Sequence, residues 1–252
     1  MDMKNITAIG FDLFNTLITV EPQTLSNAMD RLIDSLRRSG FSIEEDSFKK
    51  TYREVSLRFV ERARENGRET HNSIWISAAL ENGDDPVSPD DIRIGKAVEN
   101  YFSAFYDYCR IIPGTEEMLE TLQSRYSLGL LSNFTHGPAA REILKRTGLT
   151  PYFKTILISG ELGFRKPHPL VFQKLIEQLG TDKNQILYIG DDPAPDIHGA
   201  QAAGLQPIWS NIVRDNGIPM VPGILRSTVD KPGFKVPTIS SWKDLFILLD
   251  KK

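Results

Sequence analysis

Hydrophobic residues follow two different patterns along this chain. The first is a short apolar run at residues 6–13, which predicts a buried strand because it has the length of a strand and is followed by the turn formers Asn15 and Thr16. Between Thr24 and Asp107 the apolar residues instead recur at helical spacing. That stretch predicts four helices, at residues 24–39, 47–64, 72–80 and 90–109.

Beyond Pro113 and Gly114 the predicted strands and helices alternate. Thr115 is the expected N-cap of the first helix. Residues 211–237 are rich in Gly and Pro and predict a loop or a small irregular strand pair. The strands are predicted at residues 128–131, 155–159, 186–189 and 206–210, and the helices at residues 115–125, 137–147, 169–179, 195–203 and 242–249.

Strand–helix alternation of this kind is typical of an α/β fold with a doubly wound, mostly parallel sheet. The helical stretch interrupts that sheet after its first strand. We therefore expect a sheet domain made of residues 1–20 and 111–252, and an inserted all-helical domain at residues 21–110.

The composition adds several exclusions. Of 252 residues, 40% are hydrophobic and 25% are charged, so the chain can bury a sizeable core. A net charge of −3 gives no basic footprint for nucleic acid or an anionic membrane surface. No run approaches the roughly 18 apolar residues of a membrane span, and residues 1–5 hold no signal segment. The single Cys109 cannot form an internal disulfide, which favours a reducing, cytoplasmic location.

Polar residues of a consistent kind follow the predicted strands. The carboxyl ends of parallel strands meet at one edge of a sheet, where open α/β folds bind their ligands. Clustered carboxylates repel one another, so the sequence predicts a bound Mg²⁺, which prefers such oxygen ligands. The residues expected at this edge are Asp12, Ser132, Asn133, Lys166, Asp191, Asp192 and Asp196.

In order and approximate spacing these residues resemble the four motifs of the haloacid dehalogenase (HAD) superfamily, and the helical insert resembles its C1-type cap. The resemblance covers nearly the whole chain and implies a hydrolase with a Rossmann-like core. It implies that Asp12 is a nucleophile forming a covalent aspartyl intermediate, that Ser132 binds the transferring group and that Lys166 neutralises its charge.

The same resemblance implies a metal site and a substrate site. Asp12, Asp191 and the main-chain carbonyl of Phe14 would bind Mg²⁺, while Asp192 and Asp196 would be a further ligand or would orient the others. Asn15 and Thr16 would tighten the turn that presents Asp12, and with Asn133 they are expected near a small-molecule substrate. A monomer or homodimer is expected.

One residue departs from the pattern of HAD phosphatases. They carry a second Asp two residues after the nucleophile as general acid and base, and this chain has Phe14 there. The related 2-haloacid dehalogenases also lack that Asp, but they are metal-independent and replace the metal-binding Asp that is present here as Asp191. We therefore expect a Mg²⁺-dependent phosphatase, with a dehalogenase or a catalytically silent scaffold as alternatives.

Other conspicuous residues have ordinary structural interpretations. The four histidines, among them His71 and His136, lack ligand spacing, and Cys109 is expected to be buried and inert. The aromatic residues of the insert are expected to form mainly its core, with one or two reaching the cleft beneath it. They are Phe59, Trp75, Tyr101, Phe102, Phe105 and Tyr106.

Overall fold

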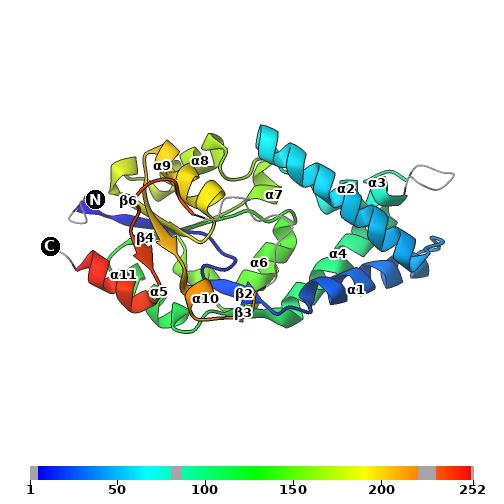
Figure 1. Cartoon of the computed structure of the whole chain (residues 1–252), viewed down its shortest axis with the longest axis horizontal. Helices are drawn as coiled ribbons and strands as arrows, with labels where there is room; N and C mark the ends of the chain where they lie inside the picture. The colour runs from blue at the N-terminus through cyan, green and yellow to red at the C-terminus, as the bar shows by residue number, and fades with distance from the viewer. Residues whose placement is uncertain (1–4, 81–86, 221–230, 251–252) are drawn as a thin grey trace.

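The computed structural model describes residues 5–80, 87–220 and 231–250. At its centre lies a parallel sheet with the strand order β5-β4-β1-β6-β7-β8 (Figure 1). The predicted α/β fold with a mostly parallel sheet is confirmed. The strands are β1 (Ala8–Phe11), β4 (Ser127–Ser132), β5 (Thr155–Ile158), β6 (Ile186–Gly190), β7 (Gln206–Ser210) and β8 (Thr238–Ile239).

Helices cover both faces of this sheet, as Figure 1 shows. On one face lie α5 (Thr115–Gln123), α6 (Gly137–Arg146) and α11 (Trp242–Leu249), and on the other α8 (Pro169–Leu179) and α9 (Gly199–Ala203). Strand β1 contributes side chains to the packing on both faces of the sheet, because successive side chains of a strand point to opposite faces.

Two glycines allow α8 to approach the sheet closely. A Cβ atom on Gly10 of β1 or on Gly129 of β4 would lie within 3 Å of a methyl carbon of Leu175. Because neither glycine has a side chain, Leu175 can pack directly on the backbone of the two central strands. These two strands carry the first two predicted site segments.

Four helices form the insert that follows the first part of the sheet domain: α1 (Thr24–Arg38), α2 (Glu45–Asn66), α3 (Asn72–Leu80) and α4 (Ile92–Tyr108). Helix α2 begins two residues earlier than predicted, because the Glu44 carboxylate accepts hydrogen bonds from the backbone N–H groups of Asp46 and Ser47. In residues 21–108, of which 81–86 lie outside the described part of the chain, the regular elements are helices, as predicted.

A short antiparallel strand pair that the sequence analysis missed joins the insert to the sheet domain. Strand β2 (Ile18–Val20) pairs with β3 (Cys109–Ile111), and Figure 1 shows the pair between the sheet and α1. Strands of three residues are too short for their alternation to show, and Cys109 was assigned to the preceding helix. The domain limits predicted after residues 20 and 110 lie at this pair, and the division itself stays a prediction.

Several element boundaries differ from the predictions. The N-cap of α5 is Gly114, at φ 79°, so the prediction of Thr115 as the cap was wrong by one residue. The hydroxyl of Thr115 donates to the carbonyl of Leu17 instead. The helix predicted at 195–203 consists of a π-helical segment (Pro193–His198) followed by α9. Short elements that were not predicted are α7 (Ser159–Leu162), α10 (Ile212–Asp215) and the 3₁₀ turns Thr150–Tyr152 and Lys183–Gln185.

The segment predicted as a loop or irregular strand pair, residues 211–237, is described only in part. Residues 211–220 contain α10, residues 231–237 contain no strand, and residues 221–230 lie outside the described part of the chain. Among the described helices none combines the length and apolar character of a membrane span.

Candidate active site

The predicted site residues come together at the carboxyl edge of the sheet. Phe11 of β1 is level with Leu130 of β4 and Ile189 of β6, so these three neighbouring strands end at nearly the same height. Asp12 follows β1, and its backbone N–H donates to the carbonyl of Ile189. Ser132 ends β4 and Asp191 follows β6, which puts all three segments at one edge.

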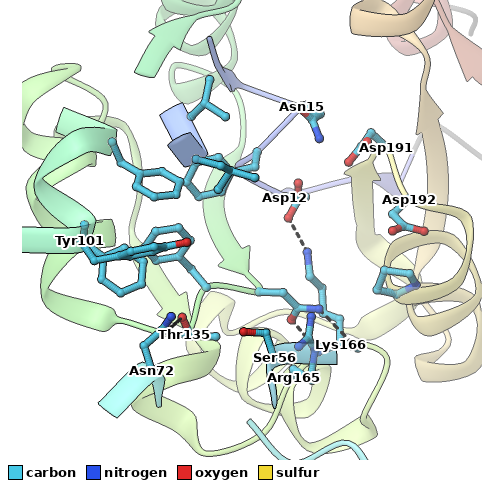
Figure 2. A pocket seen from close by; sticks show the side chains of 18 of the residues that line it. Asp12, Asn15, Ser56, Asn72, Tyr101, Thr135, Arg165, Lys166, Asp191 and Asp192 are labelled. Atoms are coloured by element: carbon cyan, nitrogen blue, oxygen red, sulfur yellow. Dashed lines mark hydrogen bonds and ion pairs between the residues drawn. The ribbon is translucent and has the colours of Figure 1, made fainter. Parts of the chain in front are cut away.

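Lys166 lies at the centre of this cluster. Its Nζ donates to Oδ1 of Asp12 at 2.6 Å, to Oδ1 of Asp196 at 2.7 Å and to the hydroxyl of Tyr188 at 2.9 Å. An ammonium group has three protons, so these contacts use its whole donor capacity. Figure 2 shows Lys166 reaching Asp12 from the side opposite Asn15.

Burial and charge oppose each other in this cluster. Burial raises the pKa of Asp12 to about 7, although Lys166 acts in the opposite direction. Burial alone would lower the pKa of Lys166, but the carboxylates of Asp12 and Asp196 outweigh it and hold the pKa well above its usual value. Lys166 is therefore a fixed positive charge beside Asp12.

The loop that carries Lys166 is held by Asn133. The side-chain amide of Asn133 donates to the Lys166 carbonyl at 3.0 Å, and its oxygen accepts from the Lys166 backbone N–H at 2.8 Å. Asn133 lines the cavity, and through these two hydrogen bonds it positions Lys166. Its expected contact with substrate stays a prediction.

The insert also holds this loop. The backbone N–H of Arg165 donates to the carbonyl of Gly67, and the Arg165 side chain forms an ion pair with Glu69 at 3.4 Å, both side chains being at least nine-tenths buried. Glu69 further accepts a 2.6 Å hydrogen bond from the Ser159 hydroxyl. Arg165 and Glu69 are functional candidates that the sequence analysis missed, because an isolated Arg and a distant Glu look like ordinary surface charges.

The turn after β1 orients Asp12. Asn15 has φ 61°, the only positive φ of a non-glycine residue in the described ranges, and Asn tolerates this conformation. The buried hydroxyl of Thr16 donates to Oδ2 of Asp12 at 3.2 Å. The expected tightening of the turn is thus visible, with Asn15 lining the cavity and Thr16 bound to Asp12.

Asp196 is held behind the end of β6. Its Oδ1 accepts from Lys166, and its Oδ2 accepts from the backbone N–H of Asp192 at 3.0 Å. The indole N–H of Trp209 donates to the main-chain carbonyl of Asp191 at 2.9 Å. Asp196 therefore ties the lysine to the acidic segment after β6.

The hydroxyl of Ser132 is a buried polar atom that has no hydrogen-bond partner among the described residues. Leaving such a group unpaired costs roughly 1–3 kcal/mol. It lies at the end of β4, next to the segment that carries Asn133. Ser132 is not among the residues that line the cavity described below.

Three carboxylates are close enough to share a cation. One oxygen each from Asp12, Asp191 and Asp196 lies within 4.8 Å of the others. This donor set fits a hard divalent cation such as Mg²⁺. Both oxygens of Asp12 and both oxygens of Asp196 already accept hydrogen bonds, so hydrogen bonding does not decide which of the three carboxylates would bind the ion. The ligand role of the Phe14 carbonyl stays a prediction.

A cavity of about 240 Å³ opens from these carboxylates towards the insert. Its far walls are aromatic. Phe102, Phe105, Trp75 and Tyr101 line it, which is more than the one or two aromatic residues expected to reach the cleft. Trp75, Phe102 and Phe105 also belong to the buried core, as expected, and Tyr101 packs against it. Phe59 stacks behind Trp75 with ring centroids 6.2 Å apart, as a core residue does.

Two histidines for which surface or packing roles were expected connect the insert with the sheet domain. Nε2 of His71 lies 2.8 Å from Nδ1 of His136, whose Nε2 lies 3.0 Å from the Glu99 carboxylate. Burial lowers the pKa of both rings. Cys109 is buried as expected, and burial raises the pKa of its thiol to about 12.

Comparison with known proteins agrees with this architecture. The family model of haloacid dehalogenase-like hydrolases matches residues 6–204. The chain belongs to the haloacid dehalogenase-like hydrolase family. The recognition made from the four motifs is thus confirmed, and so is the expectation of a hydrolytic enzyme.

Relatives within the family are similar to this chain at modest identity. The pyrimidine 5'-nucleotidase YjjG of Escherichia coli is 33% identical over 123 residues, which are 48% of this chain and about half (54%) of that protein's length. The ribulose-1,5-bisphosphate 5-phosphatase of Halopiger xanaduensis is 29% identical over 205 residues, 80% of this chain and 83% of the relative.

Solved structures show the same fold. The HAD-hydrolase YfnB of Bacillus subtilis, solved with bound magnesium, has a TM-score of 0.64 at 22% identity and covers 98% of this chain and 100% of its own. A 2-haloacid dehalogenase from Pseudomonas syringae has a TM-score of 0.69 at 22% identity, with 97% and 98% covered. At these identities the structural likeness shows the fold alone.

Proposed function

We propose that this chain is a Mg²⁺-dependent phosphatase that transfers a phosphoryl group from a small phosphate ester to Asp12 and then to water. The observation that carries the proposal is the meeting of Asp12, Lys166 and Asp191 at one edge of the sheet. The phosphatase and nucleotidase relatives support it. A cytoplasmic location and a monomeric or homodimeric state belong to the same proposal.

Asp12 would be the nucleophile. One of its carboxylate oxygens forms a bond to phosphorus while the ester P–O bond breaks, and the electron pair leaves with the alcohol oxygen. Lys166 offsets the charge of the incoming phosphate, and the unpaired hydroxyl of Ser132 donates to a phosphate oxygen. Water then attacks the aspartyl phosphate, which releases inorganic phosphate and restores Asp12.

The metal would be held by Asp12 and Asp191 with the carbonyl of Phe14, and Asp192 and Asp196 would keep these ligands in place. When bound, Mg²⁺ supplies positive charge that lowers the repulsion between the carboxylate and the phosphate. Asp196 performs its part through the hydrogen bonds from Lys166 and from the Asp192 backbone.

Phe14 limits the substrates. A phenyl ring cannot donate a proton to the departing oxygen, and such help is worth about 10²–10⁴-fold in rate. Esters with a good leaving group, such as acyl or aryl phosphates, therefore suit this site best.

The test is phosphate release from 4-nitrophenyl phosphate with Mg²⁺ and with a chelator, using the wild type, Asp12→Asn and the exposed control Asp34→Asn. We expect turnover that needs Mg²⁺ and survives Asp34→Asn but not Asp12→Asn. Equal rates from the wild type and Asp12→Asn would defeat the proposal. A beryllofluoride adduct on Asp12 would argue against a catalytically silent scaffold.

Phe14 also favours one second candidate, a 2-haloacid dehalogenase-like hydrolase. Halide leaves without a proton, so the missing acid would cost that reaction little. Asp12 would attack the carbon, and the carbon–halogen bond would break to release halide. Halide release from 2-chloropropionate that a chelator does not affect would support this candidate, and its absence would dismiss it.

A further inference from the structure

One side of the cavity is a continuous aromatic wall to which both domains contribute. Phe14 stacks on Phe134 with ring centroids 5.0 Å apart and an interplanar angle of 14°. Phe134 in turn contacts Phe102 at 5.2 Å and Phe105 at 5.7 Å, both from α4. The wall therefore exists only while the insert is packed on the sheet domain, as in this structure.

Positive charge is scarce in the same cavity. Arg165 and Lys166 are the only basic side chains among its described lining residues. Lys166 is paired with Asp12 and Asp196, and Arg165 is paired with Glu69. A second phosphate or a carboxylate on the substrate would thus be buried without a counter-charge, which is costly.

The hydroxyl of Tyr101 differs from the other polar groups near this apolar wall, which are hydrogen-bonded to protein groups. The Ser56 hydroxyl donates to the backbone of Tyr52, and the Asn72 amide is bound to Tyr52 and Thr135. The hydroxyl of Tyr101 forms no hydrogen bond with any described residue. Figure 2 shows it directed into the cavity.

We propose that the substrate is a phosphate ester whose leaving group is uncharged and carries a ring, and that Tyr101 selects it. The inference rests on the phosphatase proposed above. The ring packs against Phe14, Phe102, Phe105 and Phe134, and the Tyr101 hydroxyl donates to an acceptor on the ring. Esters that carry a second anionic group are excluded.

The first experiment compares benzyl, propyl and 4-carboxybenzyl phosphate. All three release a primary alcohol, so leaving-group differences are small. Burial of the ring predicts that kcat/KM is at least about tenfold higher for benzyl than for propyl phosphate. Burial of an unpaired carboxylate predicts that kcat/KM for 4-carboxybenzyl phosphate is at least about tenfold lower than for benzyl phosphate. Equal or better turnover of propyl or 4-carboxybenzyl phosphate would overturn this inference and leave the phosphatase standing.

The second experiment tests Tyr101 with the 2-, 3- and 4-pyridylmethyl phosphates, which move one acceptor around a ring of constant shape. At least one isomer should exceed benzyl phosphate in kcat/KM about threefold or more in the wild type, as one neutral hydrogen bond predicts. That gain should disappear in Tyr101→Phe and persist in Tyr106→Phe, whose ring packs under Arg146 outside the cavity. A gain that survives Tyr101→Phe, or no gain with any isomer, would overturn the role of Tyr101.

A binding measurement separates this inference from the phosphatase itself. Benzylphosphonate and propylphosphonate cannot be hydrolysed, and calorimetric titration with each reports on the cavity alone. Tighter binding of benzylphosphonate supports the aromatic wall even if no ester is turned over, a result that would count against the phosphatase only. Equal binding of the two phosphonates would overturn the proposed contact with the ring.

Discussion

Gly190 and Asp196 lie so close together that no larger residue fits at position 190. A Cβ atom there would stand 2.5 Å from both the Cβ and Oδ2 atoms of Asp196. Asp196 in turn accepts hydrogen bonds from Lys166 and from the backbone of Asp192. The missing side chain of Gly190 thus sets the position of the lysine that contacts Asp12.

Gly190→Ala should therefore impair the active site by displacing Asp196. The methyl group pushes Asp196 aside and disturbs both of its hydrogen bonds, and a misplacement of about 1 Å can cost about 100-fold in rate. We expect such a loss in phosphate release, with a loss of about 1–3 kcal/mol in unfolding free energy by urea denaturation.

The matched control is Gly95→Ala on α4. Gly95 is exposed in a helix, and a Cβ atom there meets nothing within 4 Å. That change should stabilise the protein by about 0.5–1 kcal/mol without altering turnover. Wild-type activity in Gly190→Ala would contradict the positioning role of Asp196.

The sequence was sufficient to predict the edge of the sheet where the site lies. Each long strand is an apolar run that ends at a polar residue, and parallel strands bring those ends together, so Asp12, Ser132 and Asp191 could be grouped. Lys166, in the loop after the third of these strands, and Asp196, in the turn after the fourth, were grouped with them, and the resemblance to known motifs implied their roles. The distances among these side chains had to come from the structure.

The parts that were missed depend on contacts between distant segments. Strands β2 and β3 are too short to show a pattern, and each is stable only through the other. Glu69 and Arg165 are 96 residues apart, and nothing local marks either as buried. The helical spacing of Tyr101 and Phe105 identifies an apolar face, but it does not reveal that this face borders a cavity.

Phe14→Asp tests the missing acid. A carboxyl group at this position would supply a proton to the leaving oxygen, so we expect faster turnover of benzyl phosphate, by up to about 100-fold, and a smaller gain with 4-nitrophenyl phosphate. Phe14→Asn introduces a side chain of nearly the same size as Asp that cannot act as an acid, so its turnover of benzyl phosphate should stay slow.

The two variants lose the same ring contact with Phe134, worth about 0.5–1.5 kcal/mol, so their stabilities should be similar. Circular dichroism checks that both are folded. A folded Phe14→Asp protein that is no faster than Phe14→Asn would mean that the cavity does not admit an alcohol leaving group at this place.

Glu69→Gln tests the ion pair that joins the insert to the lysine loop. The change leaves the buried guanidinium of Arg165 without its counter-charge, which should lower the unfolding free energy by about 3–5 kcal/mol. Turnover should fall too, because Arg165 precedes Lys166. Glu161→Gln removes the more exposed pair with Arg141 and should cost less than about 1 kcal/mol. Similar losses in both variants would show that burial of the first pair has no special effect.

The contact between His71 and His136 predicts how stability depends on pH. Nδ1 of His71 is approached by the Ser73 backbone N–H at 3.2 Å, which leaves its Nε2 to donate to Nδ1 of His136. The other nitrogen of His136 then donates to Glu99. This chain of donors is complete when both rings are neutral, and a further proton on either ring would face another N–H group.

The sign of the effect follows from this arrangement. Burial lowers the pKa of both histidines below their ordinary value of 6.5, while Glu99 acts in the opposite direction. Below pH 6.5 the unfolded chain therefore binds protons that the folded chain does not, so the free energy of unfolding decreases as the pH falls through that value. Urea denaturation between pH 8 and pH 5 should show this decrease, and His136→Gln should make it smaller. The exposed His198 provides the control, because His198→Gln leaves the buried pair intact. If His136→Gln keeps the full slope of the wild type, the pH dependence arises elsewhere and the two rings are not its source.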